Sequence, residues 1–223
     1  MQQEVLNSDH ALWFSPEGRY LAYIQFNDTE VNWYKFPWYG DRKNSYTTIR
    51  EIAYPKPGYP NPTVKVYVID LQNDPMKKIE LSEPADFINI DHYVVNVAWA
   101  SEKAVTVTWL NRDQNDAILH MCDLTSSQPY SLCKQNSNLR VQDGWVDDKY
   151  TTPLFSADGS YYITLWPFTQ SGAGKFIHLA KMSTNPKGIN NPSALTSGEW
   201  EILKILTHDD VNERVLKGPS ETR

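Results

Sequence analysis

Apolar and polar side chains alternate along several well-separated segments of the chain. The alternation is clearest at residues 64–68, 105–109 and 161–165, where branched aliphatic and aromatic residues occupy every second position. A period of two places neighbouring side chains on opposite faces of a β-strand. Residues 200–206 are the longest stretch with a plausible helical pattern, but this stretch is short and fits a strand that ends in a turn equally well. We therefore predict an all-β chain.

One hairpin-like motif occurs three times. The clear copies are residues 12–23 and 154–164, and residues 97–107 form a degenerate third copy. In the clear copies Gly18 and Gly159 stand in the predicted tight turn, where a positive φ favours glycine. Each copy is therefore predicted to be a β-hairpin.

Each predicted hairpin is followed by a further alternating segment, at residues 63–71, 118–124 and 175–181. Repeated units of about four antiparallel strands are typical of β-propeller blades. We count three units and the first strand of a fourth at residues 198–206. Closed propellers have roughly 4–8 blades, so we predict a partial propeller. A single sandwich of duplicated hairpins is the alternative.

The alternation stops near the C-terminus of the sequence. We assign residues 1–215 to the partial propeller domain and residues 216–223 to an unstructured tail. The boundary rests only on the loss of the period-two pattern.

Composition and charge exclude several classes of protein. The net charge is -6 and Lys and Arg form no cluster, which argues against a nucleic-acid partner. No apolar run reaches the roughly 18 residues of a membrane span, and the first residues lack the basic and apolar regions of a signal peptide. We therefore expect neither an anchor nor a signal within this sequence.

No catalytic motif is present in the sequence. A serine hydrolase of the α/β class needs a G-x-S-x-G elbow, and none occurs. The five histidines have no metal-ligand spacing, and His92 is predicted to be a hydrogen-bonded structural residue. Residues 171–175 resemble a phosphate loop, but Thr169 and Phe176 replace two required residues. We expect no catalytic residue, no metal and no cofactor.

Cys122 and Cys133 are the only cysteines. The Ser-Ser-Gln-Pro stretch between them predicts a turn, and a hairpin there would bring the two Cα atoms to the ~5.5 Å that suits a disulfide. Two buried free thiols are the alternative. A disulfide would indicate an extracellular compartment.

Asn27-Asp28-Thr29 is the sole N-x-[ST] sequence in which the middle residue is not proline. We therefore predict a glycan on Asn27 if the chain enters the secretory pathway.

About a dozen short motifs, spread over residues 2–215, match one known family in order. They include Leu12-Trp13-Phe14-Ser15-Pro16, Tyr54-Pro55-Lys56-Pro57-Gly58, Asp91-His92-Tyr93, Trp109-Leu110-Asn111-Arg112 and Thr196-Ser197-Gly198-Glu199-Trp200. On these motifs the chain resembles the N-terminal β-propeller of the dipeptidyl peptidase IV family, serine peptidases of the prolyl oligopeptidase clan.

The resemblance implies a piece of a larger serine exopeptidase. Members pair an eight-bladed propeller with a C-terminal α/β-hydrolase domain that carries a Ser/Asp/His triad, and they remove N-terminal dipeptides with Pro or Ala second. The resemblance further implies a homodimer, a type II membrane or secreted ectodomain, and a glycan at the position of Asn27. The triad lies outside this sequence, so whether the whole protein is an enzyme stays open.

The resemblance also implies one binding site. It aligns Gln3 and Glu4 with two glutamates that bind the ammonium group of the substrate. Glu4 can accept a charge-assisted hydrogen bond, whereas the bond that the neutral Gln3 amide accepts is roughly half as strong. The alternative for these residues is a frayed terminus. The alternative for the protein is an inactive family member that acts as an interaction or potassium-channel auxiliary ectodomain, which Gln3, residues 109–112 and residues 172–176 favour.

Overall fold

The computed structural model describes residues 5–6, 8–40, 46–72, 74–126, 132–142, 144–147, 152–170, 172–185, 190–209, 212 and 214–222. Within these residues the chain forms strands β1 to β18 and a short 3-10 helix, η2 (Ala85–Phe87). The all-β prediction is confirmed.

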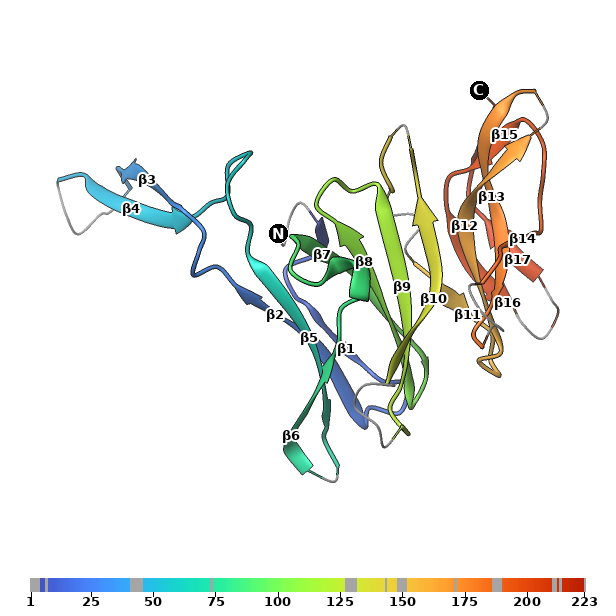
Figure 1. Ribbon diagram of the computed structural model, residues 1–223, viewed down its shortest axis with the longest axis horizontal. Helices are drawn as coiled ribbons and strands as arrows, with labels where there is room; N and C mark the ends of the chain where they lie inside the picture. The colour runs from blue at the N-terminus through green and yellow to red at the C-terminus, as the bar shows by residue number, and fades with distance from the viewer. Residues whose placement is uncertain are drawn as a thin grey trace.

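Twelve of the strands form three separate four-stranded antiparallel sheets. Their bounds are β1 (Leu12–Phe14), β2 (Tyr20–Asn27), β5 (Thr63–Asp70), β6 (Asp74–Leu81), β7 (His92–Ser101), β8 (Ala104–Asn111), β9 (Asp116–Asp123), β10 (Cys133–Arg140), β11 (Leu154–Phe155), β12 (Tyr161–Gln170), β13 (Gly174–Ser183) and β14 (Ser193–Ala194). The orders are β1-β2-β5-β6, β10-β9-β8-β7 and β11-β12-β13-β14. We call them the first, second and third blade, and Figure 1 shows them side by side.

The three copies of the sequence motif are the hairpins that begin the three blades. They are β1–β2, β7–β8 and β11–β12. Gly18 and Gly159 adopt φ of 73° and 67°, the left-handed conformation that a side chain disfavours. Three separate sheets in chain order confirm the partial propeller and exclude the two-layer sandwich.

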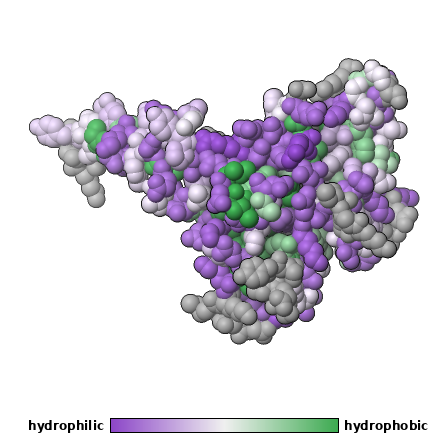
Figure 2. Space-filling model, in the orientation of Figure 1, coloured by the Kyte–Doolittle hydropathy of each residue, from purple (hydrophilic) through white to green (hydrophobic). Residues whose placement is uncertain are grey.

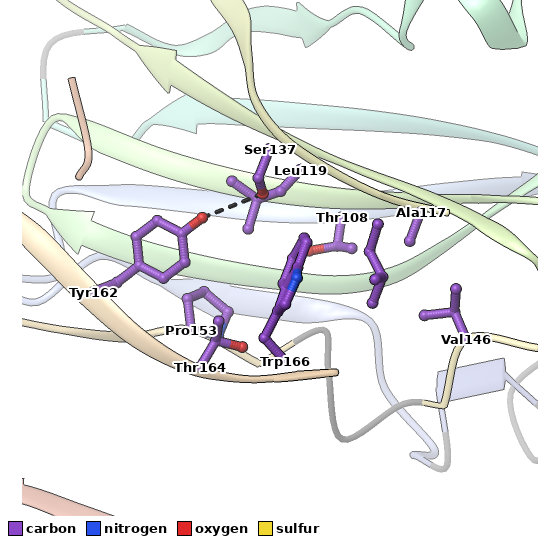
Figure 3. A pocket seen from close by; sticks show the side chains of 10 residues that line it. Thr108, Ala117, Leu119, Ser137, Val146, Pro153, Tyr162, Thr164 and Trp166 are labelled. Atoms are coloured by element: carbon purple, nitrogen blue, oxygen red, sulfur yellow. Dashed lines mark hydrogen bonds between the residues drawn. The ribbon is translucent and has the colours of Figure 1, made fainter. Parts of the chain in front are cut away.

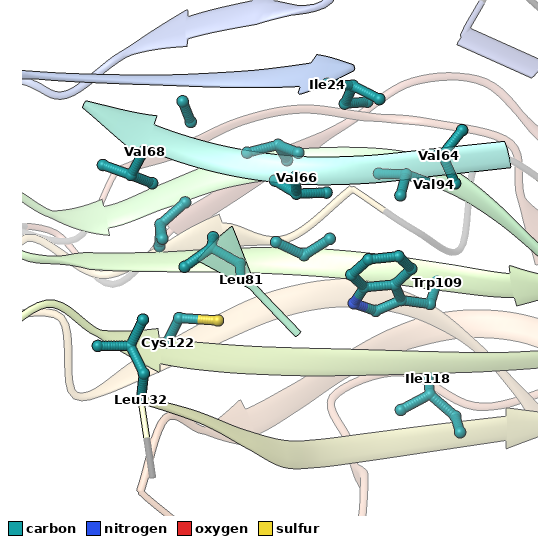
Figure 4. Close-up of a cluster of buried hydrophobic side chains, with 14 of the residues drawn as sticks. Ile24, Val64, Val66, Val68, Leu81, Val94, Trp109, Ile118, Cys122 and Leu132 are labelled. Carbon is teal, nitrogen blue, oxygen red and sulfur yellow. The ribbon is translucent and has the colours of Figure 1, made fainter. Parts of the chain in front are cut away.

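The period-two pattern buries one row of side chains between the first and second blades. Ala22, Val66 and Val68 from the first blade pack in one cluster with Val107 and Trp109 from the second. Figure 4 shows Val66, Val68 and Trp109 between the strands. Trp109 is 1% and Val66 0% exposed, and full burial of an aliphatic side chain such as that of Val66 contributes roughly 1.5–3 kcal/mol. Apolar packing therefore joins these two blades.

A fourth unit follows the third blade. It consists of β15 (Trp200–Ile202), β16 (Ile205–Asp209), β17 (Arg214–Lys217) and β18 (Ser220–Thr222), with β15 paired to β18 and β16 to β17. Ile202 packs with Ile163 and Leu179 of the third blade. The start of a fourth blade is confirmed, but the expected unstructured tail differs from the structure, because pairing with β15 and β16 gives residues 214–217 and 220–222 strand partners.

An arm projects from the first blade between β2 and β5 (Figure 1). It is the two-stranded sheet of β3 (Trp33–Trp38) and β4 (Thr48–Ala53), which pair only with each other among the described strands. The sequence pattern did not predict this arm. Its residues are mostly exposed, and Figure 2 shows pale spheres of intermediate hydropathy together with purple and green ones on the arm.

Candidate functional site

The edge strands that begin the blades surround one cavity, here called the axial cavity. Its volume is about 550 Å³, and its wall includes Trp13 in β1, Asn96 in β7, Leu154 in β11 and Lys204 between β15 and β16. Propeller blades are arranged around a central channel. The cavity therefore corresponds to part of that channel.

Polar side chains stand among the apolar residues of the axial cavity. His10, Asn96, Thr152 and Lys204 all lie on its wall, and the Asn96 amide donates to Thr152 Oγ1 at 3.1 Å. Sequence reasoning missed these residues. A signal was available, because Asn96 and Thr152 occupy the same position of the repeated motif, three residues before Trp99 and Phe155.

Ser8, Asp9 and His10 lie together at the rim but do not form a catalytic relay. Ser8 Oγ and Asp9 Oδ1 lie 3.2 Å and 2.7 Å from the same ring nitrogen, His10 Nδ1. A triad needs the nucleophile and the carboxylate on opposite nitrogens. The hydrogen bond with His10 also lowers the pKa of the Asp9 carboxyl.

The predicted pair Gln3 and Glu4 lies outside the described residues. The first described residues, Val5 and Leu6, line the axial cavity. The site assignment of Gln3 and Glu4 therefore stays a prediction.

A second cavity lies between the second and third blades. It has a volume of about 20 Å³, room for about one water molecule. Figure 3 shows Thr108 and Ser137 on one side and Tyr162 and Trp166 on the other. Its size and apolar lining fit a packing gap rather than a ligand site.

The described histidines are spread through the blades. His178 is fully buried, with its ring nitrogens near Thr196 Oγ1 and the Gly198 carbonyl. Burial lowers the pKa of His120, whose Nδ1 lies 3.3 Å from the Ser82 carbonyl oxygen. Across the described ranges no three His, Cys, Asp or Glu side chains form a group that could hold a metal ion.

His92 was predicted to be a fully hydrogen-bonded structural histidine, and the structure supports only half of this. Its Nδ1 donates to the Ile90 carbonyl at 2.9 Å. Its Nε2 is buried without a hydrogen-bond partner among the described residues. The ring packs against Phe87 and Trp109, so His92 is a packing residue.

Cys122 and Cys133 form a disulfide. They are opposite residues of the antiparallel pair β9 and β10, with Cα atoms 3.9 Å apart. The structure therefore contains the disulfide and not the alternative of two free thiols.

Asn27 is the last residue of β2 and is exposed. Its Oδ1 accepts hydrogen bonds from the Thr29 N–H, at 3.1 Å, and from the Thr29 hydroxyl. The described residues contain no helix with the length and hydropathy of a membrane span.

We expect expression through a secretory pathway to add one N-linked glycan at Asn27. Intact-mass measurement should show a single glycan mass that peptide N-glycosidase removes and that Asn27→Gln abolishes. Asn191→Gln is the matched control, because Pro192 disqualifies that sequence. An unmodified wild-type mass would contradict the prediction.

Comparison with models of known protein families shows to which family the chain is related. The model of the dipeptidyl peptidase IV (DPP IV) N-terminal region matches residues 1–216. The chain belongs to this family. The resemblance inferred from the motifs is therefore confirmed.

Curated relatives of the DPP IV family align over almost the whole chain. Inactive dipeptidyl peptidase 10 from Rattus norvegicus is 34% identical over 96% of this chain and 26% of its own length. Dipeptidyl peptidase 4 from Sus scrofa is 33% identical over 93% of this chain and 27% of its own length. Prolyl endopeptidase FAP from Mus musculus is 32% identical over 92% and 26%. The chain spans about a quarter of the length of these relatives.

Solved structures share the fold. Dipeptidyl peptidase 4 of Porphyromonas gingivalis superposes with a TM-score of 0.72 at 24% identity, over 93% of this chain and 27% of that one. A putative dipeptidyl aminopeptidase IV from Bacteroides ovatus superposes with a TM-score of 0.71 at 20% identity, over 93% and 29%. The likeness supports the propeller architecture of the DPP IV N-terminal region.

Proposed function

We propose that this chain is the part of a DPP IV-like propeller that gates and binds the N-terminus of a peptide with Pro or Ala second. Glu4 and Gln3 contact the ammonium group of the peptide. One observation carries the proposal: Val5 and Leu6, which directly follow this pair, line the axial cavity. In the whole protein a C-terminal hydrolase domain supplies the nucleophile and base that cleave the peptide.

The chemistry of the pair supports this assignment. A carboxylate accepts charge-assisted hydrogen bonds from an ammonium group, and such bonds are roughly twice as strong as neutral ones. Asn96 and Thr152 add amide and hydroxyl groups on the cavity wall that can bond a peptide backbone. A peptide with a free amine should therefore bind more tightly than its acetylated form.

We expect Glu4→Ala in the full-length protein to lower kcat/KM for an Ala-Pro substrate by roughly 10- to 100-fold, because a hydrogen bond to a charged group contributes roughly 1.5–3 kcal/mol. Gln3→Glu should raise it, because a second carboxylate then contacts the amine. Glu30→Ala, an exposed carboxylate in a turn after β2, is the matched control. If neither pair variant differs from the control, Gln3 and Glu4 are not the amine-binding pair.

A second candidate function is that of an inactive family member, which binds another protein and does not recognise peptide N-termini. Gln3 favours it, since an amide replaces one of the two expected carboxylates. Titration of an Ala-Pro peptide and its acetylated form distinguishes the two functions. Selective binding of the free amine supports the first proposal, and no difference between the peptides supports the second.

We also propose that the arm formed by β3 and β4 mediates a homodimer. A two-stranded sheet is marginally stable in water unless something packs on it. Both faces of the arm carry apolar side chains: Tyr34, Phe36 and Trp38 contact one another on one face, and Trp33 and Ile49 are 61% and 63% exposed on the other. A second copy is the occupant that we propose, because Lys35 of the arm already pairs with Glu51, which leaves the exposed apolar side chains as the surface to be covered.

We expect the double variant Trp33→Ser, Ile49→Ser to sediment as a monomer in the analytical ultracentrifuge, at concentrations at which the wild-type protein sediments as a dimer. Exposed apolar side chains at an interface contribute through their burial on association. Leu195→Ser, an exposed apolar residue in the third blade, is the matched control. Dimerisation of the double variant with unchanged affinity would contradict the proposal.

A further inference from the structure

The arm is attached to the first blade by two connecting segments, residues 28–32 and 54–62. A hairpin held only by its two connections can swing about them. The described contacts near its root therefore decide where it points. Two of these contacts reach across to the second blade rather than to the blade from which the arm emerges.

Arg112 makes the first contact. It follows β8, and its guanidinium pairs with Asp91, the residue before β7. The other side of the same guanidinium donates from Nη2 to the Tyr59 carbonyl, in the connecting segment of the arm, at 2.7 Å. One side chain thus bonds the second blade and the arm connection at once.

Asn61 makes the second contact. Its Nδ2 donates to the Tyr93 hydroxyl at 2.8 Å. Tyr93 is the second residue of β7, so this bond also ends on the second blade. We call the five residues Tyr59, Asn61, Asp91, Tyr93 and Arg112 the arm clamp.

The segment between the arm clamp and β4 is stiff. Residues 55 and 57 in this segment are prolines, and prolines 60 and 62 flank Asn61 of the arm clamp. Each proline fixes its own φ and restricts the residue before it. Gly58 has φ of 81°, and the Tyr59 N–H bonds the Lys56 carbonyl at 3.0 Å, which closes a turn. A contact that holds Tyr59 in place therefore also holds Tyr54 and the end of β4 in place.

The arm clamp contributes little to stability. The side chains of Arg112 and Asp91 are 34% and 41% exposed, and solvent screening leaves ion pairs of this exposure with little effect on stability. Arginine nevertheless suits the position, because its planar fork bonds a carboxylate and a carbonyl in fixed directions, whereas a lysine ammonium is a single point charge. The arm clamp therefore fixes the orientation of the arm more than it stabilises the fold.

We propose that the arm clamp sets the orientation of the arm, and that the second blade thereby presents the arm to a second copy of the chain. Arg112 is the central positioning residue. The inference rests on the proposed homodimer, since it assigns how the dimerising surface is held. Holding the arm in its bound orientation lowers the ordering cost of association.

The test measures arm orientation directly. Spin labels at Thr47→Cys on the arm and Lys134→Cys on β10 give one intramolecular distance, because both native cysteines are in the disulfide; dilution with unlabelled protein removes intermolecular distances. Arg112→Met should broaden the distance distribution, and Arg112→Lys should broaden it less. Arg19→Met is the matched control, because it removes the Arg19–Asp70 ion pair within the first blade. A wild-type distribution in Arg112→Met would overturn the inference.

Sedimentation of the same variants tests the link to association. We expect Arg112→Met to raise the dimer dissociation constant about tenfold, and Arg19→Met to change it by less than about twofold. Equal dissociation constants for the two would overturn the link. If Trp33→Ser, Ile49→Ser dimerises like the wild type, the homodimer proposal fails, and the distance distribution still decides whether Arg112 holds the arm.

Discussion

Replacing Asn136 by alanine is expected to lower the free energy of unfolding by about 2–4 kcal/mol. Asn136 is 2% exposed between the second and third blades. Its Nδ2 donates to the carbonyls of Ser183 and Thr184, at 3.0 and 3.1 Å, and its Oδ1 accepts from the Tyr162 hydroxyl and from Asn190 Nδ2, at 2.9 and 3.1 Å. Alanine leaves several of these buried groups with fewer partners and creates a gap.

A bulge in β10 explains why Asn136 can reach the third blade. The register with β9 shifts between Gln135 and Ser137, so Asn136 is the extra residue. Its carbonyl accepts from the Asn190 N–H at 3.0 Å instead of from a ladder partner. Burial raises the pKa of Tyr162 to about 12, so its hydroxyl remains a donor to Asn136 at physiological pH.

Urea denaturation measures the effect, with an unchanged m-value required for the comparison. Tyr162→Phe removes the hydroxyl that donates to Asn136 Oδ1 and lies 3.2 Å from Ser137 Oγ, and it should cost about 0.5–1.5 kcal/mol for each bond lost. Asn138→Ala is the matched control on the same strand, because Asn138 Oδ1 has no hydrogen-bond partner among the described residues. A loss of unfolding free energy in Asn136→Ala no larger than that in Asn138→Ala would contradict the structural role of Asn136.

Glu102→Gln is expected to lower the free energy of unfolding by about 1.5–3 kcal/mol at neutral pH. Glu102 lies in the β7–β8 turn, and its carboxylate accepts bonds from the Ser15 hydroxyl at 2.6 Å, the Glu17 N–H at 2.7 Å and the Arg19 N–H at 3.2 Å. All three donors belong to the β1–β2 turn of the first blade. Glutamine would turn one acceptor oxygen into a donor that faces another donor.

The same contacts give the effect a pH dependence. Partial burial raises the pKa of Glu102, but the three hydrogen bonds outweigh burial and hold that pKa below its ordinary value. Because the folded pKa is the lower one, the contribution is complete above the unfolded pKa of about 4.3 and is lost as pH falls through the folded pKa. The stabilities of wild type and Glu102→Gln should therefore converge in acid. A difference that stays constant from pH 7 to the acid range would contradict this explanation.

The equivalent turn of the third blade shows why Glu102 was not predicted. There the Ser160 N–H and the hydroxyls of Ser156 and Ser160 hold the pKa of Asp158 at about 2, so that turn is closed by its own residues. In the degenerate copy Ala100 replaces the serine that begins the turn. Glu102 is then available to the neighbouring blade, a tertiary contact that a motif comparison does not contain.

The blades were predictable because the signals for their strands and turns lie within short stretches of the sequence. Period-two patterns mark strands with one buried face, and Gly18 and Gly159 mark turns that need positive φ. The arm was not predictable in this way. Residues 33–38 carry aromatic side chains at both odd and even positions, because neither face of β3 packs on a core. Strand β18 was missed for a related reason, since pairing with β15 and not its own polar sequence makes it a strand.

The candidate site was only partly accessible from sequence. Family resemblance proposed Gln3 and Glu4, whereas the axial cavity depends on how separate blades converge, which no local pattern specifies. The sequence repeat places Asn96 and Thr152 at equivalent positions, but only the arrangement of the strands shows that both line one cavity.

The most direct test of the central proposal is a cryo-EM structure of the full-length protein with an Ala-Pro peptide bound. We predict that the peptide amine lies about 2.7–2.9 Å from a carboxylate oxygen of Glu4, at the axial cavity bounded by Val5, Leu6 and Asn96. An amine held by a different carboxylate, or a peptide bound away from this cavity, would contradict the proposal.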